Sequence, residues 1–224
     1  MNKEQYIASK LREFPNVKHI DYSICSRCKN CCCKITACGL LPHDIPELTV
    51  DGIKRILDTG KYSITFMYIA SINKPLPIMI SREIGGDKIN NSLIRTTCSL
   101  LGENGCTLSE AERPTQALLL IPRENEKCET LVPGWETMRE WQEYEELMKT
   151  VIFEETGKSV NELFEEGCRK DVKKLIQKIE NDEELTYTED IAMDLLTQKA
   201  MHMIVSNASF EEMLLEIVLS EMKK

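Results

Sequence analysis

The sequence lacks several features that would assign the protein to a common class. No apolar run approaches the roughly 20 residues that a membrane-spanning helix needs. The start carries Glu4 and no apolar stretch, so we expect no signal peptide and a cytoplasmic protein. Basic residues are not in excess, because 28 Lys and Arg face 37 Asp and Glu and give a net charge of -9. We therefore expect neither a nucleic-acid nor a membrane partner.

Sequence patterns of several enzyme classes are also missing. The chain contains no GxxxxGK[ST] or GxGxxG phosphate loop, no HExxH helix, no GxSxG elbow and no radical-SAM CxxxCxxC spacing. The sequence thus predicts no catalytic residues, and whether the protein is an enzyme stays open.

Proline and strand-like patterns disappear from Gly134 onward. The periodicity there predicts helices over residues 135–155, from Ser159 to about 180, from Thr186 or Thr188 to about 205, and from Ser209. Trp135 and Trp141 are expected to anchor this part to the rest of the chain.

The preceding part is mixed. Helices are expected at residues 2–14 and after Thr49, and strands at residues 62–70, 75–80 and 93–101. The predicted fold class is therefore α+β. An irregular cysteine-rich metal-binding module with a few short strands occupies residues 1–133, and an all-helical half occupies residues 134–224.

Cysteine is the abundant residue that stands out. Six of the ten cysteines lie between Cys25 and Cys38. A reducing cytosol disfavours structural disulfides, so clustered cysteines are better explained as thiolate metal ligands. An extracellular disulfide framework is the competing interpretation, and the missing export signal argues against it.

Two cysteine motifs carry the expected chemistry. Cys25-x-x-Cys28-x-x-Cys31-Cys32 supplies four thiolates from eight residues. Farther along, Cys98 and Cys106 flank a glycine-containing turn that leaves room for backbone amides to face sulfur. We expect both stretches to converge on one inorganic centre.

These motifs, together with Glu112-Arg113-Pro114, resemble the CxxCxxCC family of zinc- or iron-chelating proteins, often described as iron–sulfur cluster-containing. The resemblance covers about residues 20–125. The family typically has another cysteine three residues after its Arg-Pro pair, where this sequence has Ala117. Cys128 is the candidate replacement. A flagellin lysine methylase is similar in its cysteine motif, which implies that such a module occurs in enzymes.

The predicted metal ligands outnumber those of a single zinc ion. A structural zinc site needs four ligands, and the excess favours an iron–sulfur cluster, with zinc as the alternative. The ferredoxin spacing is absent, because Cys32 and Cys33 follow Cys31 directly. The predicted metal ligands are Cys25, Cys28, Cys31, Cys32, Cys98, Cys106 and Cys128.

Other candidates have simpler interpretations. Cys33 and Cys38 are interpreted as spare. The three adjacent cysteines at residues 31–33 cannot all point the same way, because side chains alternate along an extended backbone, so one of the three is expected to face away. Cys168 has helical spacing to apolar neighbours and is expected to be a small buried hydrophobe. His43 is close enough in sequence to be a minor ligand candidate.

Three functions are compatible with these patterns. The first is iron–sulfur cluster binding for electron transfer, redox sensing or support of a modification reaction, with an unidentified protein or redox partner. The second is a structural zinc module in a scaffold or partner-binding protein. The third is an enzyme, such as a methyltransferase-like protein.

Overall fold

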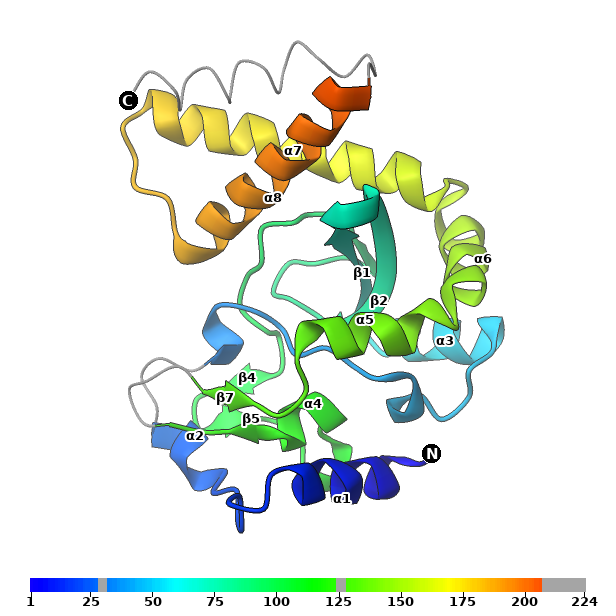
Figure 1. The fold of residues 1–224 in the computed structure, drawn as a ribbon, viewed down its shortest axis with the longest axis vertical. Coiled ribbons are helices and arrows are strands. Elements are labelled where there is room, and N and C mark those ends of the chain that lie inside the picture. The colour runs from blue at the N-terminus through cyan, green and yellow to red at the C-terminus, as the bar shows by residue number, and fades with distance from the viewer. Residues whose placement is uncertain (28–31, 124–127, 207–224) are drawn as a thin grey trace.

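The computed structural model describes residues 1–27, 32–123 and 128–206 and confirms an α+β fold with a helical C-terminal half. Helices α7 (Val160–Glu180) and α8 (Tyr187–Ser206) lie at one end of the molecule (Figure 1). A three-stranded sheet lies in the middle, and helix α1 (Lys3–Glu13) lies at the opposite end beside several short elements.

The sheet has the strand order β2-β1-β3. Strands β1 (Tyr62–Ile69) and β2 (Lys74–Ser81) pair antiparallel, with Tyr62 opposite Ser81, and β3 (Ile89–Asn90) pairs parallel to β1. Both long strands were predicted from their apolar residues. Nearly every residue of β2 is buried, because α5 (Gly134–Gln142), α6 (Glu145–Thr156) and α7 all contact it.

The helical half differs from the prediction in one place. The single helix expected over residues 135–155 is wrong, because α5 and α6 are separate helices. Tyr144 leaves the helical region at φ -109° and ψ 12°, and its ring packs edge-on against Trp141 at 6.3 Å. Trp141 is fully buried and its indole donates a hydrogen bond to the Leu40 carbonyl at 2.7 Å, whereas Trp135 is 58% exposed. The helix expected from Ser209 lies outside the described residues.

One hydrophobic core joins residues before and after position 134. Phe66 of β1 packs edge-on against Phe164 of α7 at 6.0 Å, and Tyr68 stacks on the same ring at 5.6 Å. Each fully buried large apolar side chain contributes roughly 1.5–3 kcal/mol to stability. The same cluster contains Trp141 and Leu196, so the helices and the sheet depend on each other.

The strand expected over residues 93–101 is also wrong. Most of that segment is an irregular loop in which Cys98 forms one isolated β-bridge with Glu83. Only Leu101–Gly102 (β4) belongs to a strand, in a hairpin with Gly105–Cys106 (β5). The Asp171 carboxylate of α7 binds the loop by accepting hydrogen bonds from the Leu93 amide at 2.6 Å and the Ser92 hydroxyl at 2.8 Å. These bonds to a helix replace the strand pairing that the sequence pattern suggested.

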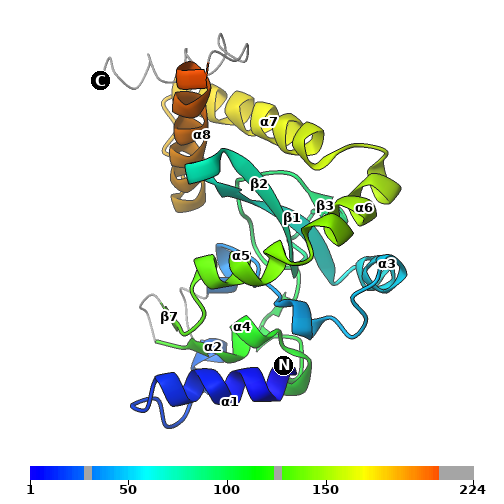
Figure 2. The same ribbon diagram turned by 45° about the vertical axis from the view of Figure 1, so that its right-hand side comes forward.

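Several short elements form the end of the molecule that contains α1. In both views α5 lies between the sheet and these elements (Figure 2). The buried Glu136 of α5 accepts hydrogen bonds from the Tyr6 hydroxyl at 2.6 Å and the Lys10 ammonium at 2.8 Å, which binds α1 to α5. The short elements at this end are α2 (Ser23–Arg27), α4 (Thr115–Leu118), β6 (Leu120–Ile121) and β7 (Glu129–Thr130). Helix α3 (Val50–Asp58) lies instead against β1 and α6.

Replacing Gly167 with alanine tests the contact between α7 and the loop. A Cβ at this position would lie 1.7 Å from the Asn91 carbonyl oxygen, so helix and loop must separate. We expect Gly167→Ala to lower the free energy of unfolding by about 2–3 kcal/mol in urea titrations. The exposed Lys170→Ala on the same helix is the control, with an expected change within about 0.5 kcal/mol. Equal stability of Gly167→Ala and wild type would contradict this packing.

Glu189 makes stability depend on acidic pH. Burial raises the pKa of its carboxyl, but Lys178, Thr186 and Lys174 lower it more, to about 2 from an ordinary value of 4.5. Because the folded pKa is the lower one, the contribution of Glu189 is present above pH 4.5 and is lost as the pH falls toward 2. Urea titrations of Glu189→Gln should show lower stability at pH 7 and a shallower loss across this range. The exposed Glu184→Gln should follow wild type, and a wild-type acid response in Glu189→Gln would refute the assignment.

Candidate functional site

Five cysteine side chains line one cavity of about 80 Å³. They come from two segments that are far apart in sequence, residues 25–38 and residues 98–106. Three of the predicted ligands are therefore brought together. The lining cysteines are Cys25, Cys33, Cys38, Cys98 and Cys106.

Cys25 reaches the cavity from α2, which is fixed by its neighbours. The Asp21 carboxylate accepts a hydrogen bond from the Ser23 amide at 2.9 Å at the start of this helix. The Tyr22 hydroxyl donates a hydrogen bond to the Leu118 carbonyl at the end of α4. Helix α2 also contacts β5, the strand that carries Cys106, so Cys25 and Cys106 lie on neighbouring elements of the cavity lining.

Cys33 and Cys38 are lining residues that the sequence analysis interpreted as spare. Cys33 lies in a 3₁₀ turn, Cys32–Lys34, so the alternation expected for an extended backbone does not apply to it. Its carbonyl accepts a hydrogen bond from the Cys98 amide at 2.7 Å, and the Cys38 carbonyl accepts one from the Ser81 amide at 2.8 Å. Neither long-range pairing is visible in the cysteine spacing.

Cys98 and Cys106 of the second motif line the same cavity as Cys25 of the first. Cys98 is 4% exposed and forms a β-bridge with Glu83. Gly105 adopts φ +97°, which other residues rarely adopt, and this conformation closes the hairpin that holds Cys106. Burial raises the pKa of the Cys98 thiol, and a backbone hydrogen bond at Leu100 opposes that rise.

The other predicted ligands are not placed in the cavity wall. Cys28 and Cys31 lie outside the described residues, and the Cys32 side chain lies outside the described side chains. Of the described cysteines, Cys128 and Cys168 do not line this cavity. Cys168 is fully buried on α7, and burial raises the pKa of its thiol to about 12, in agreement with the interpretation as a small hydrophobe.

Two elements of the predicted motif face the same space. Arg113 and Pro114 line it, and so does Ala117, at the position where the resemblance implies another cysteine. His43 instead forms a 2.9 Å hydrogen bond between its Nε2 and the Thr115 hydroxyl, and its ring packs 4.7 Å from the Tyr6 ring. Burial lowers the pKa of His43, which suits this structural position.

The cavity is mostly apolar apart from its sulfur atoms. Its walls are completed by leucine and proline side chains, and the Arg113 guanidinium lies 5.3 Å from the centre of the Tyr22 ring. Among the described residues, no group of three or more His, Cys, Asp or Glu side chains is arranged to hold a metal ion. The five thiols thus surround a space and do not meet at one point.

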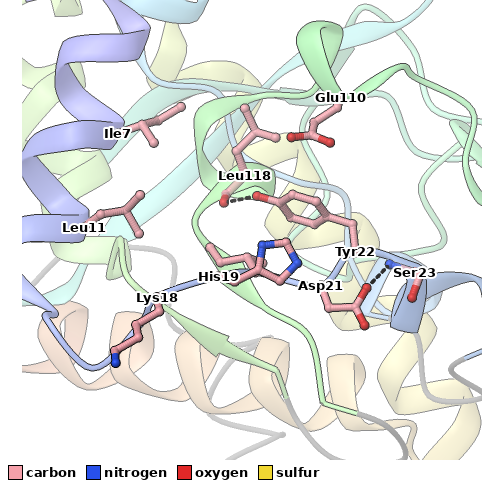
Figure 3. A pocket seen from close by; sticks show the side chains of 10 residues that line it. Ile7, Leu11, Lys18, His19, Asp21, Tyr22, Ser23, Glu110 and Leu118 are labelled. Carbon is pink, nitrogen blue, oxygen red and sulfur yellow. Dashed lines mark hydrogen bonds between the residues drawn. The ribbon is translucent and has the colours of Figure 1, made fainter.

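A larger cavity of about 520 Å³ lies next to this one and has a different lining. Ile7 and Leu11 of α1 line one side, and Tyr22 faces them with its hydroxyl directed at the Leu118 carbonyl (Figure 3). Tyr22 borders both cavities and separates them. No cysteine lines the larger cavity among the described residues, so the thiol chemistry belongs to the smaller one.

Comparisons with protein-family models, curated proteins and solved structures found no match to this chain. The resemblance to the CxxCxxCC family therefore stays a prediction. Within the described ranges, no helix is both long enough and apolar enough to span a bilayer.

Single cysteine variants test which thiols belong to the site. We expect Cys38→Ser and Cys106→Ser each to lower metal affinity at least tenfold, because each removes a thiolate from the cavity wall. Cys168→Ala should bind metal as wild type does, since the Cys168 side chain is fully buried on α7 and does not line the cavity. Elemental analysis of folded, anaerobically prepared protein gives the occupancies. Full occupancy in Cys38→Ser would exclude that residue from the site.

Proposed function

We propose that this protein binds an iron–sulfur cluster in the cysteine-lined cavity. The observation that supports the proposal most strongly is that five cysteines from two distant segments line one enclosed space. A cluster of this class is held by four cysteine thiolates, so the described lining residues alone exceed that requirement. The proposed ligands come from the set Cys25, Cys33, Cys38, Cys98 and Cys106, together with Cys28, Cys31 and Cys32 of the first motif.

The size of the cavity favours a centre of several atoms. A cavity needs a volume of roughly 10–15 Å³ to hold one water molecule. The cavity measures about 80 Å³, which is several times larger. A single zinc ion would require the thiols to close around one point, whereas a cluster occupies the space between them.

The surroundings of the thiols suit a negatively charged sulfur-rich centre. Arg113 supplies a positive charge at the wall, and the backbone at Leu100 and Cys38 lowers the pKa of the Cys98 thiol against the rise that burial causes. Hydrogen bonds to sulfur, net charge and solvent exposure set the reduction potential of such a centre. A bound cluster supplies one-electron chemistry, which would serve electron transfer, redox sensing or support of a modification reaction.

Metal and sulfide analysis tests the proposal. After anaerobic purification or reconstitution with iron and sulfide, we expect brown protein with broad visible absorbance and comparable amounts of iron and acid-labile sulfide. The double variant Cys98→Ser/Cys106→Ser should lose the absorbance, and Cys168→Ala should keep it. Colourless protein with stoichiometric zinc, or no retained iron and sulfide after reconstitution, would contradict the proposal. The zinc result would favour the structural zinc module.

A further inference from the structure

A second cavity, of about 200 Å³, shares a wall with the cysteine-lined cavity and is distinct from the 520 Å³ cavity lined by α1. The two cavities share the segment around Cys38, which is extended and pairs with β2 through the bridge between Gly39 and Ile80. Side chains of extended segments alternate, so Cys38 lines the first cavity, while Ala37 and Gly39 line the second. The second cavity is therefore a separate space with its own lining.

The guanidinium of Arg95 is the charged group of this second cavity. One of its terminal nitrogens donates to the Thr65 hydroxyl at 2.6 Å and the other donates to the Phe66 carbonyl at 3.1 Å. A guanidinium has five N–H donors, so three remain beyond these two bonds. Arg95 is thus held in place by β1 and retains unused donors.

No carboxylate in the described part of the chain forms an ion pair with Arg95. The acidic groups that act on it from a distance are Glu83 and Asp171. Glu83 accepts hydrogen bonds from the Asn90 side chain at 2.7 Å and the Thr96 amide at 3.1 Å, and Asp171 is engaged with the loop at residues 92–94. A half-buried cation without a contacting anion favours an anionic ligand.

The rest of the lining defines the shape of such a ligand. Gln116 and Thr137 form one polar side, joined by a hydrogen bond from the Gln116 amide to the Thr137 hydroxyl. Met67, Ile78 and Ile80 form an apolar side. Arginine recognises carboxylates through paired N–H donors, and the apolar side suits a hydrocarbon body.

We propose that this cavity binds a small organic carboxylate whose carboxylate group lies against the Arg95 guanidinium and whose short hydrocarbon body packs against Met67 and Ile78. At about 200 Å³ the cavity is smaller than the roughly 300–1,000 Å³ of sites for drug-sized ligands, so the ligand has only a few carbon atoms. The proposal does not depend on a metal in the neighbouring cavity, because none of its contacts involves a cysteine side chain.

Calorimetric titration of the full chain with butyrate tests the proposal, with the uncharged butyramide as the matched ligand. We expect saturable butyrate binding and at least tenfold weaker binding of butyramide. Arg95→Met should weaken butyrate binding at least tenfold. Arg139→Met, which removes an arginine that packs on the exposed Trp135, should bind butyrate as wild type does.

A second variant separates ligand binding from the structural bonds that Arg95 makes to β1. Gly134 lines the cavity, and a Cβ there would meet only the Met67 methyl carbon at an ordinary 3.5 Å. Gly134→Val keeps Arg95 and occupies part of the cavity, so it should fold and bind butyrate at least tenfold more weakly. The proposal would be overturned if wild type showed no saturable butyrate binding, or if it bound butyramide as tightly as butyrate or inorganic phosphate more tightly than butyrate. Wild-type affinity for butyrate in Gly134→Val would also overturn it.

Discussion

The hydrogen bond from the Cys98 amide to the Cys33 carbonyl, at 2.7 Å, joins the two cysteine-containing segments of the chain. Around it, the Thr97 hydroxyl donates to the Lys34 carbonyl at 3.0 Å, and the Ser81 amide donates to the Cys38 carbonyl at 2.8 Å. These bonds attach residues 33–38, which contain few large apolar side chains, to strand β2 and to the loop before β4. The thiols are therefore positioned by backbone pairing with β2 and the loop that follows it, and not only by their spacing in the sequence.

The same pairing gives the protein two cavities with different chemistry. Because residues 37–39 are extended beside the end of β2, one face of this wall presents sulfur and the other faces the Arg95 guanidinium. Helix α4 contributes in the same way, since Ala117 lines the first cavity and Gln116 lines the second. A ligand in the second cavity would thus lie one backbone layer away from the proposed metal centre.

Features with local causes were predictable from the sequence, and features with long-range causes were not. The strands β1 and β2 follow from their own apolar residues, and the start of α7 follows from the capping pair Ser159 and Glu162. The irregular loop before β4 depends on Asp171, about 80 residues farther along the chain, so its own strand-like composition was misleading. The places of Cys33 and Cys38 in the cavity wall likewise depend on partners outside the cysteine motif. The common place of Cys25, Cys98 and Cys106 in one cavity lining was predicted from the hypothesis of a shared metal site.

The central claim is that the two cysteine segments share one inorganic centre. The most direct test measures the alkylation rates of individual cysteines by mass spectrometry, in folded anaerobic protein before and after the metal is removed with a chelator. Cys25 and Cys106, one from each segment, are both only partly buried and serve as reporters. We expect the metal to protect both residues and both to become reactive together when it is removed. Protection of one reporter while the other reacts at the same rate with and without metal would contradict a shared centre.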